Sequence, residues 1–485
     1  MTDRSTLHSL RGRALPEWYD DAKFGIFVHW GLFSVPAFAP TGNGDLNEVL
    51  RREGIDGWFR LIPYSEWYVN SMRIPGSPTA RFHAEHYGAD FPYRSFQPLF
   101  ERAADSFDAT VWARLFAASR ARYAVLVTKH MDGYCLWPSG TPHPAMTGFG
   151  SPRDLVGEVA DAVRREGLRF GVYYSSWLDQ SLTTTAMRDV VALYTEGGPR
   201  TRAYARYQRA HWQELIERHA PSVLWGDIAY PAHDDPDELL AAYYERVPDG
   251  VVNDRWAQVP VWLEKILRRN PVRKLVTRLV ERSVRRGTPA RNPQGRHFDF
   301  ATREYETPPD IRSEKWELCR GMAKGFGFNR ADTAADHLDL AELIDLLADV
   351  VSKNGNLLLN VGPRADGSVP DVQRALLEGL GRWLDVNGEA IFATTPWTRA
   401  SVETPDGTIV RFTRRGSTVY AIVRGALPGQ ELTLPDLHPP LGSVTILGAI
   451  DAKLQATSRP NGTTVTLASP HPTPFPVLRF QAGAH

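Results

Sequence analysis

The amino-acid sequence predicts an α/β chain, with a TIM-like (β/α) barrel over residues 1–397 and a C-terminal antiparallel β-sandwich over residues 398–485. Three observations lead to this prediction. Short apolar runs alternate with amphipathic segments through most of the chain, and polar residues follow directly after these runs. Beyond residue 397 the runs become short and β-branched, and Gly, Pro and Asn-Gly separate them.

The apolar runs of the first part have the length of buried strands. They are KFGIFVHWG, ARYAVLVTKH, LRFGVYYS, SVLWGDI, VVND and GNLLLNVG. Between them lie segments such as FDATVWARLFAASRA, whose apolar residues recur three and four positions apart, as on one face of a helix. Strands that alternate with helices indicate parallel βα units, and we expect them to close into a barrel.

The last part of the chain has a different pattern. The runs TIVRFTRRGSTVYAIVRG, ELTLPDL, SVTILGAI and TTVTLASP favour short antiparallel strands in a sandwich. We expect this domain to pack against the barrel, and ligand binding by it stays open.

A basic insert at residues 257–296 fits neither pattern. It carries eleven Lys or Arg against two Glu, and Pro271 interrupts apolar residues at helical spacing. The simplest interpretation is a solvated insert whose apolar face packs on the barrel. A cover over the active site, a subunit contact in a homo-oligomer and a contact with phosphate or anionic lipid stay open, and contact with a membrane is the less favoured of these.

Composition limits the classes of partner and cofactor. Lys plus Arg and Asp plus Glu number 56 each, so the chain as a whole has no bias toward nucleic acid, and we expect no nucleic-acid partner. The sequence begins without an apolar signal segment, and no run approaches the roughly 18 apolar residues of a membrane span; we therefore expect a cytoplasmic protein. Two cysteines, Cys135 and Cys319, are expected to be free, buried thiols. Phosphate-loop, zinc-site and serine-nucleophile motifs are absent, so we expect no metal and no cofactor.

Four polar residues stand where a barrel enzyme places its chemistry, directly after apolar runs. They are His29, His130, Asp227 and Arg255. Trp225 lies two positions before Asp227 and points to the same side of an extended strand. An indole beside a carboxylate suits a sugar, whose apolar face stacks while its hydroxyls need partners. Taken singly, these residues could equally cap a helix, form a surface ion pair or lie in the core.

A second carboxyl group is needed for glycoside hydrolysis. The segment HFDFATREYETP, which follows the insert, offers three candidates: Asp299, Glu304 and Glu306. The pattern of residues alone does not choose among them.

Several stretches together are specific enough to indicate a family. In order along the chain they are EWYDDAKFGIFVHWGLFSVPAFAP, YSEWYVN, FDATVWARLFAASRARYAVLVTKHMDGYCLWPS, LRFGVYYSSW, VLWGDIAYP, VVNDRW, WELCRGMAKGFGFN and VSKNGNLLLNVGPRADGSVP. From about residue 15 to about residue 397 the chain resembles the alpha-L-fucosidases of glycoside hydrolase family 29. The resemblance implies a TIM-like barrel followed by a β-sandwich, and hydrolysis of alpha-L-fucosides with retention on a small-molecule or oligosaccharide substrate.

The resemblance also assigns roles by position. It makes Asp227 the nucleophile, Glu304 of DFATREY the acid/base and Arg255 a residue that positions the carboxylates. The residues that it implies for the fucose pocket are His29, Glu66, Trp67, His130, Tyr173 and Trp225, with Phe326 facing the methyl group.

One position departs from the family pattern. Met131 follows His130 where the family usually has a second His, so a thioether replaces a hydrogen-bonding group. We expect Met131 to contact the sugar as a substrate-binding residue, and an O-methylated or otherwise modified 6-deoxyhexose would then suit the pocket. The other alternative is a catalytically silent sugar-binding barrel, in which the insert holds Glu304 away from Asp227.

Overall fold

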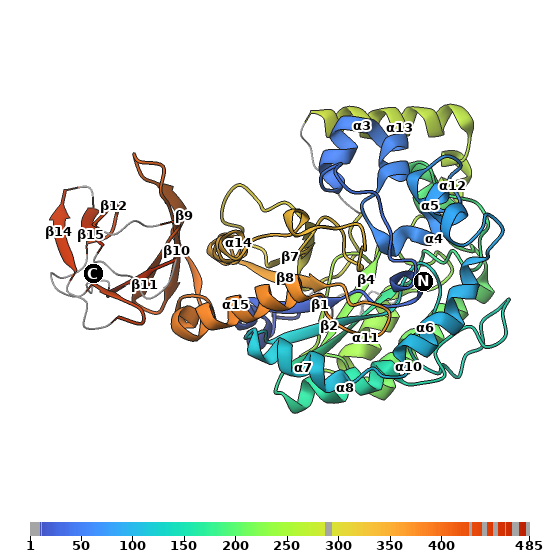
Figure 1. Ribbon diagram of the computed structural model, residues 1–485, viewed down its shortest axis with the longest axis horizontal. Helices are drawn as coiled ribbons and strands as arrows, with labels where there is room; N and C mark the ends of the chain where they lie inside the picture. The colour runs from blue at the N-terminus through green and yellow to red at the C-terminus, as the bar shows by residue number, and fades with distance from the viewer. Residues whose placement is uncertain are drawn as a thin grey trace.

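The computed structural model describes residues 10, 12–286, 293–425, 429–438, 444–449, 454–460, 462–467 and 475–481, with Arg285 described by its backbone alone. Its first part is built on a sheet of eight parallel strands, with helices around it (Figure 1). The strands are β1 (Phe24–Val28), β2 (Tyr123–Lys129), β3 (Arg169–Ser175), β4 (Val223–Asp227), β5 (Val251–Val252), β6 (Ala301–Glu304), β7 (Trp316–Gly321) and β8 (Gly355–Val361).

The two edges of this sheet meet and close it into a barrel. The strand order is β5-β4-β3-β2-β1-β8-β7-β6. Asn253, just after β5, forms a parallel bridge with Phe300, just before β6. Beside this bridge the Asp299 N–H donates to the Val252 carbonyl at 2.9 Å. The predicted TIM-like barrel is confirmed.

Two barrel strands are absent from the predicted apolar runs. β6 reads ATRE and is half-buried throughout, and β7 reads WELCRG and carries a buried glutamate. These two strands are recognised by their pairing with the rest of the sheet and not by an apolar pattern. A strand inside a closed barrel can carry polar side chains when those side chains find hydrogen-bonding partners.

The outer helices follow the predicted periodicity. In α8 (Leu155–Arg165) the side chains of Leu155, Val159 and Val163 are buried on one face, four positions apart. Asp154 caps this helix by accepting from the Gly157 N–H at 2.9 Å. Each buried Val or Leu contributes about 1.5–3 kcal/mol relative to exposure, so an Asp at Val159 would disrupt the contact with the sheet.

The other helices before the insert mostly lie in the connection between β1 and β2. Besides α8, the helices of the barrel outside the insert are α2 (Glu17–Ala22), α3 (Leu46–Leu61), α4 (Tyr68–Ser71), α5 (Pro78–His86), α6 (Gln97–Ala104), α7 (Ala109–Ala118), α9 (Val190–Thr195), α10 (Arg202–His219), α11 (Pro236–Arg246), α14 (Leu340–Ser352) and α15 (Asp371–Asn387). None of the helices within the described residues is long and apolar enough to cross a membrane.

The basic insert forms two helices between β5 and β6, α12 (Val261–Leu267) and α13 (Asn270–Arg285). Pro271 lies in the first turn of α13, where a missing N–H costs nothing. α13 packs on α3 and α9, and it lies along the edge of the barrel beside α3 in Figure 1. The two helices follow the carboxyl end of β5, and Val280 and Val284 of α13 line the cavity at that end of the barrel, where the candidate residues were predicted.

The last part forms two antiparallel sheets with a common core. One sheet has the order β13-β16-β11-β10-β9 and the other β12-β15-β14. The strands are β9 (Thr395–Glu403), β10 (Ile409–Arg415), β11 (Thr418–Val423), β12 (Glu431–Pro435), β13 (Val444–Ile446), β14 (Gln455–Arg459), β15 (Gly462–Thr466) and β16 (Val477–Gln481). Phe412 and Phe480 of the first sheet and Leu432 of the second are buried in one cluster, so the predicted sandwich is confirmed. Arg411 joins it to the barrel through ion pairs with Asp345 and Asp349 of α14.

Candidate active site

A cavity of about 760 Å³ opens at the carboxyl ends of the barrel strands. Ten of the eleven site residues predicted from the sequence line it. They are His29, Glu66, Trp67, His130, Tyr173, Trp225, Asp227, Arg255, Glu304 and Phe326. A volume of this size suits one sugar ring with part of a leaving group.

Two carboxylates meet on one guanidinium at the centre of the cavity. Nη1 of Arg255 lies 2.8 Å from Oδ1 of Asp227, and Nη2 lies 2.6 Å from Oε1 of Glu304. The Arg255 side chain is 6% exposed, so its charge acts in surroundings from which water is largely excluded. The insert therefore does not hold Glu304 away from Asp227.

The other two candidate carboxylates have different surroundings. Asp299 accepts hydrogen bonds from the Tyr244 hydroxyl at 2.7 Å and the Val252 N–H at 2.8 Å, which ties the closing edges of the barrel together. Glu306 pairs with Arg51 at 3.1 Å, with its side chain 34% exposed. Of the three, only Glu304 shares Arg255 with Asp227.

Arg255 is held in place by a short network. Its Nε donates to Oγ1 of Thr302 at 2.9 Å, and that hydroxyl donates to Oδ1 of Asp254 at 2.6 Å. The guanidinium also lies over the Trp225 ring, 4.7 Å from its centroid. These contacts fix the fork of Arg255 in the plane in which it holds both carboxylates.

Burial and hydrogen bonding act against each other on Asp227. Burial raises the pKa of this carboxyl above its ordinary value, and the negative charge of Glu304 acts in the same direction. Arg255 and the Tyr173 hydroxyl, which donates to Oδ2 at 2.8 Å, oppose the increase. The ionised form is thus supported on both oxygens.

The backbone turns in an unusual way directly after each carboxylate. Ile228 has φ 46° and Ala229 has φ 78°, and Tyr305, which follows Glu304, has φ 59°. Left-handed backbone at a residue other than glycine costs about 1–3 kcal/mol and tends to occur at functional sites. Both strands therefore end sharply at the residue whose carboxylate faces Arg255.

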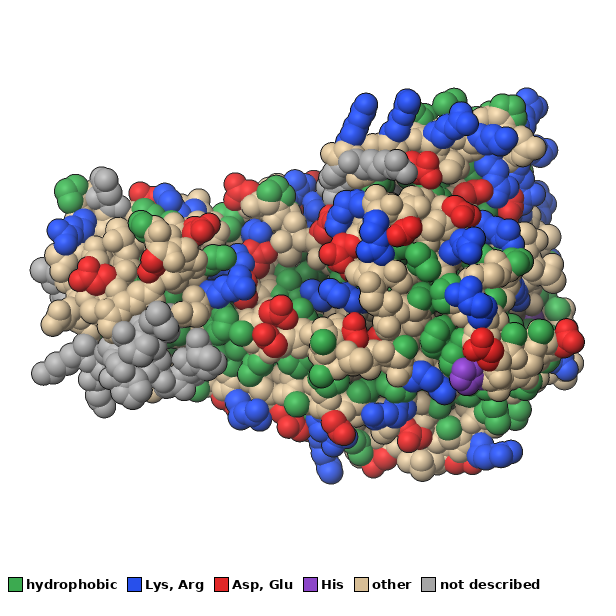
Figure 2. All heavy atoms as spheres, turned by 45° about the horizontal axis from the view of Figure 1, so that its top comes forward, with side chains coloured by type: hydrophobic (Ala, Val, Ile, Leu, Met, Phe, Trp, Pro, Cys, Tyr) green, Lys and Arg blue, Asp and Glu red, His purple; other side chains and the backbone are tan. Residues whose placement is uncertain are grey.

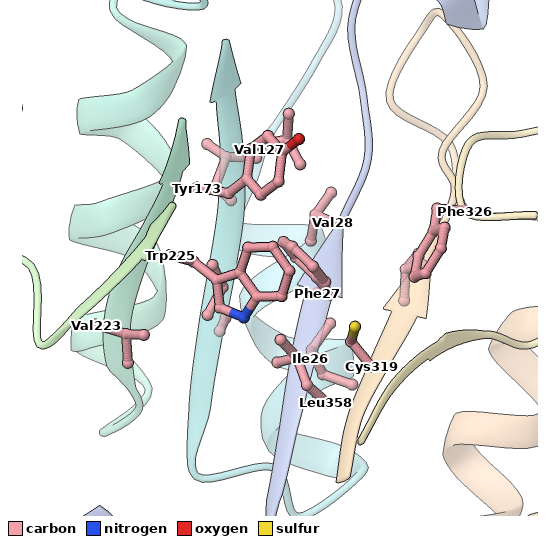
Figure 3. Packing of buried hydrophobic residues seen from close by; sticks show 14 of the residues in the cluster. Ile26, Phe27, Val28, Val127, Tyr173, Val223, Trp225, Cys319, Phe326 and Leu358 are labelled. Atoms are coloured by element: carbon pink, nitrogen blue, oxygen red, sulfur yellow. The ribbon is translucent and has the colours of Figure 1, made fainter. Parts of the chain in front are cut away.

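Aromatic side chains form the wall beside the carboxylates. Trp225 and Tyr173 are stacked at 5.5 Å, and the Phe27 ring lies 5.3 Å from Trp225. Figure 3 shows these three side chains, from β1, β3 and β4, turned toward one another, with Phe326 on the far side of Phe27. The alternation of β4 explains why Trp225 and Asp227 share one side, as predicted.

His29 is neutral in this pocket. Burial lowers its pKa to about 3. Nδ1 lies 2.6 Å from Oδ1 of Asn360, whose amide nitrogen donates to the Phe326 carbonyl. Because the Asn360 oxygen accepts, Nδ1 of His29 is the donor and Nε2 is left as an acceptor for a hydroxyl. The His130 ring lies parallel to Tyr173 at 5.6 Å, and burial lowers its pKa as well.

Comparison with known proteins gives this geometry a family. The sequence profile of the alpha-L-fucosidases matches residues 3–389. The chain belongs to this family. The alpha-L-fucosidase of Branchiostoma floridae is 33% identical over 454 residues, which cover 91% of this chain and 86% of the relative. Human tissue alpha-L-fucosidase is 31% identical over 427 residues, 85% of this chain and 76% of the relative.

A solved structure agrees over nearly the whole chain. The Thermotoga maritima alpha-fucosidase, solved in complex with a mechanism-based inhibitor, superposes with a TM-score of 0.81 at 37% identity and covers 99% of both chains. The family is one of retaining glycosidases, so the protein is a glycosidase of the alpha-L-fucosidase class.

Glu66 is a further buried carboxyl group of the fucosidase cavity. It lies with Trp67 on the short 3-10 helix η2 (Ser65–Trp67) and accepts from the Gly327 N–H at 2.8 Å. Burial raises its pKa to about 7. Near neutral pH this group can both donate and accept, which suits a hydroxyl-bearing ligand.

Met131 is the predicted site residue that the structure does not bring to the cavity. Its side chain is 1% exposed within the barrel core, and it is not part of the cavity lining. Its carbonyl accepts from the Gln180 N–H at 2.7 Å. The predicted contact between a thioether and the sugar is therefore wrong, and the argument for a modified sugar loses its support.

Sequence reasoning missed several residues of the lining. Phe27 lies two positions before His29, so alternation along β1 could have indicated it. Tyr64 directly precedes the 3-10 helix that carries Glu66, and alternation does not indicate it. The Tyr64 hydroxyl lies 3.3 Å from Oε2 of Glu304. Val280 and Val284 of the insert also line the cavity, and no local pattern marks them out from the other apolar residues of α13.

Proposed function

We propose that the protein hydrolyses alpha-L-fucosides through a covalent glycosyl-enzyme on Asp227, with Glu304 as acid and base. The observation that supports this assignment is the shared guanidinium, because Arg255 contacts one oxygen of each carboxylate within 2.8 Å. Two carboxyl groups held on one fork lie within reach of one glycosidic bond. Retaining glycosidases need a separation of about 5–5.5 Å.

The charges of the site suit the first step. Arg255 compensates one negative charge, so one ionised carboxylate and one protonated carboxyl group make the group of three neutral. In this state an oxygen of Asp227 attacks the anomeric carbon. The bond from that carbon to the leaving oxygen breaks, and the Glu304 proton passes to the leaving oxygen.

The second step reverses these roles. Glu304, now ionised, takes a proton from water, and the water oxygen attacks the anomeric carbon. The bond to Asp227 breaks, so Asp227 leaves as a carboxylate and Glu304 is protonated again. Two inversions at the same carbon give net retention.

The remaining lining residues fit the recognition of a 6-deoxy sugar. Trp225 and Tyr173 offer apolar ring faces, and Nε2 of His29 and the Glu66 carboxyl offer hydrogen-bonding partners for hydroxyls. Phe326, 5.0 Å from the His29 ring, supplies an apolar surface for the methyl group.

Azide rescue of two glycine variants tests the two roles. With an aryl alpha-L-fucoside, Asp227→Gly should lose activity, and azide entering the vacated space should give the beta-fucosyl azide in one inversion. Glu304→Gly should keep the covalent step for a good leaving group, and azide should then give the alpha-fucosyl azide. Product stereochemistry by NMR distinguishes the roles.

The matched control is Glu306→Gln, which alters a nearby carboxylate that pairs with Arg51 rather than Arg255. It should keep turnover within about tenfold of the wild type. Alpha azide from the Asp227 variant, or equal loss in the control, would contradict the assignment.

A further inference from the structure

The insert concentrates the exposed apolar side chains of the protein. Six large hydrophobic side chains are exposed in the described part of the chain, and four of them lie on α12 and α13. These are Trp262 at 65%, Ile266 at 39%, Leu275 at 57% and Leu279 at 53% exposure. Single exposed apolar residues are ordinary, but four on two consecutive helices form a patch.

Basic side chains surround this patch. Lys274, Arg278 and Arg282 are exposed on α13 at the helical spacing of Leu275 and Leu279. Lys265 and Arg269 are exposed beside Ile266. Figure 2 shows basic and apolar side chains together along the top of the molecule, where α13 lies in Figure 1. We call these apolar and basic residues the outward face.

The acidic residues of α12 and α13 are turned away from the outward face. Of the two glutamates of α12 and α13, Glu264 is buried and pairs with Arg200 at 2.9 Å. Glu281 is half-buried and lies 3.3 Å from the Ile55 N–H of α3. No Asp or Glu within the described residues 261–286 is therefore exposed among the basic side chains.

The opposite side of α13 is anchored, so the outward face is preformed. Arg273 pairs with Asp189 and Glu196, both at 2.7 Å, and holds the helix to the segment around α9. Val280 and Val284 turn inward and line the active-site cavity. Binding through the outward face then costs little ordering of the chain.

We propose that the outward face docks on a lipid bilayer that carries anionic headgroups. A helix that presents leucine and tryptophan between lysines and arginines buries its apolar side chains at the headgroup boundary while the cations meet the headgroups. A soluble polyanion would contact the basic side chains alone. The alternation of basic and apolar side chains matches a bilayer surface instead. Docking would bring the cavity to within about one helix diameter, roughly 10 Å, of the membrane.

Vesicle sedimentation of the full chain tests this proposal. The probes are vesicles of phosphatidylcholine alone and of phosphatidylcholine with 30% phosphatidylserine, at low and at high salt. The wild type should sediment with the anionic vesicles alone, and less so at high salt, because exposed charges are screened.

Two sets of substitutions separate the two components. Lys274→Glu with Arg278→Glu and Arg282→Glu should weaken binding about 100-fold or more, since each basic residue contributes about fivefold. Leu275→Ser with Leu279→Ser should weaken it about tenfold. None of these residues lines the cavity, so thermal midpoint and fucoside turnover should stay near the wild-type values.

Matched controls lie on helices elsewhere. Arg114→Glu with Arg202→Glu and Arg206→Glu reverses three exposed charges on α7 and α10. Leu99→Ser with Val111→Ser removes the two large hydrophobic side chains that are exposed in the described residues outside the insert. Both should bind vesicles within about threefold of the wild type.

Several results would overturn the proposal. The proposal is wrong if the folded wild type stays in the supernatant with anionic vesicles. It is also wrong if the control variants lose as much vesicle binding as the variants of the outward face. A concentration-dependent dimer in sedimentation velocity that the leucine changes abolish, without vesicle binding, would assign the outward face to a second copy of the chain. Binding to heparin that the leucine changes leave intact, without vesicle binding, would assign it to a soluble polyanion.

Discussion

Two buried carboxylate sites lie inside the same barrel and differ in what compensates them. Asp227, at the carboxyl end of β4, meets the cation of Arg255. Glu317, near the amino end of β7 and 0% exposed, accepts three hydrogen bonds from neutral donors. The donors are Tyr19 at 2.8 Å, Tyr123 at 2.6 Å and Trp225 at 3.0 Å.

Trp225 lies between the two sites. Its indole N–H binds Glu317, and its ring carries the Arg255 guanidinium. Neutral donors satisfy a carboxyl group and leave it no vacant partner, whereas a cation shared with Glu304 permits the charge to change during a reaction. The comparison teaches that burial alone does not mark a catalytic carboxylate; the kind of partner does.

The largest effect should come from removing the shared cation. Arg255→Gln should lower kcat/KM about 10³-fold and the free energy of unfolding by about 3–5 kcal/mol at pH 7, because two buried carboxyl groups lose their partner. Without Arg255 the raised pKa of Asp227 rises further, so the stability deficit should grow as pH rises. Turnover and urea unfolding at pH 5 and 7.5 measure both effects.

The control for that substitution is Arg51→Gln. It removes the cation that pairs with the partly exposed Glu306, where a loss of at most about 1 kcal/mol is expected. A similar loss in the free energy of unfolding in the two variants would mean that the buried ion pairs of Arg255 contribute no more to stability than an exposed ion pair does.

A second effect concerns Glu66, whose partners are backbone N–H groups, that of Gly327 first, rather than a cation. Its pKa is about 7 in the folded protein against an ordinary 4.5. The folded state keeps a proton that the unfolded chain releases, so this stabilisation is fully present below about pH 4.5 and is lost as pH rises through about 7. Between pH 5 and 8 the free energy of unfolding of the wild type should fall by about 2–3 kcal/mol relative to that of Glu66→Gln. Urea titrations at each pH measure it, and parallel curves would contradict the assignment.

A smaller effect should follow from Glu317→Gln. The amide brings a donor among three donors, so at least one buried group loses its partner, at a cost of about 1–3 kcal/mol. Because Glu317 acts through Trp225, kcat/KM should fall by less than about tenfold. Thermal unfolding and fucoside kinetics give both values, and a 10³-fold loss of turnover would break the distinction between the two sites.

The smallest effect should come from Met131. Met131→Leu conserves volume in the core and should cost less than about 1.5 kcal/mol. Since the side chain does not line the cavity, the ratio of kcat/KM for a fucoside and its O-methylated analogue should not change. A changed ratio would return Met131 to the site.

Much of the site was predictable because its signals are local. Trp225 and Asp227 share a side through strand alternation, and apolar runs located six of the barrel strands. β6 and β7 escaped this reasoning because their polar residues are satisfied by strands distant in the sequence. Identification of Glu304 required the family resemblance, since Asp299 and Glu306 offered the same chemistry in the same segment.

The sequence by itself determined the barrel, the sandwich and the residue types at the strand ends, because periodicity and turn residues act over a few positions. Only the tertiary structure decided that β5 and β6 meet to close the barrel, and that Glu304 rather than Asp299 shares Arg255. It also decided that Met131 points into the core and that α13 presents leucines and arginines outward. These outcomes depend on contacts between residues far apart in the chain, which local pattern does not encode.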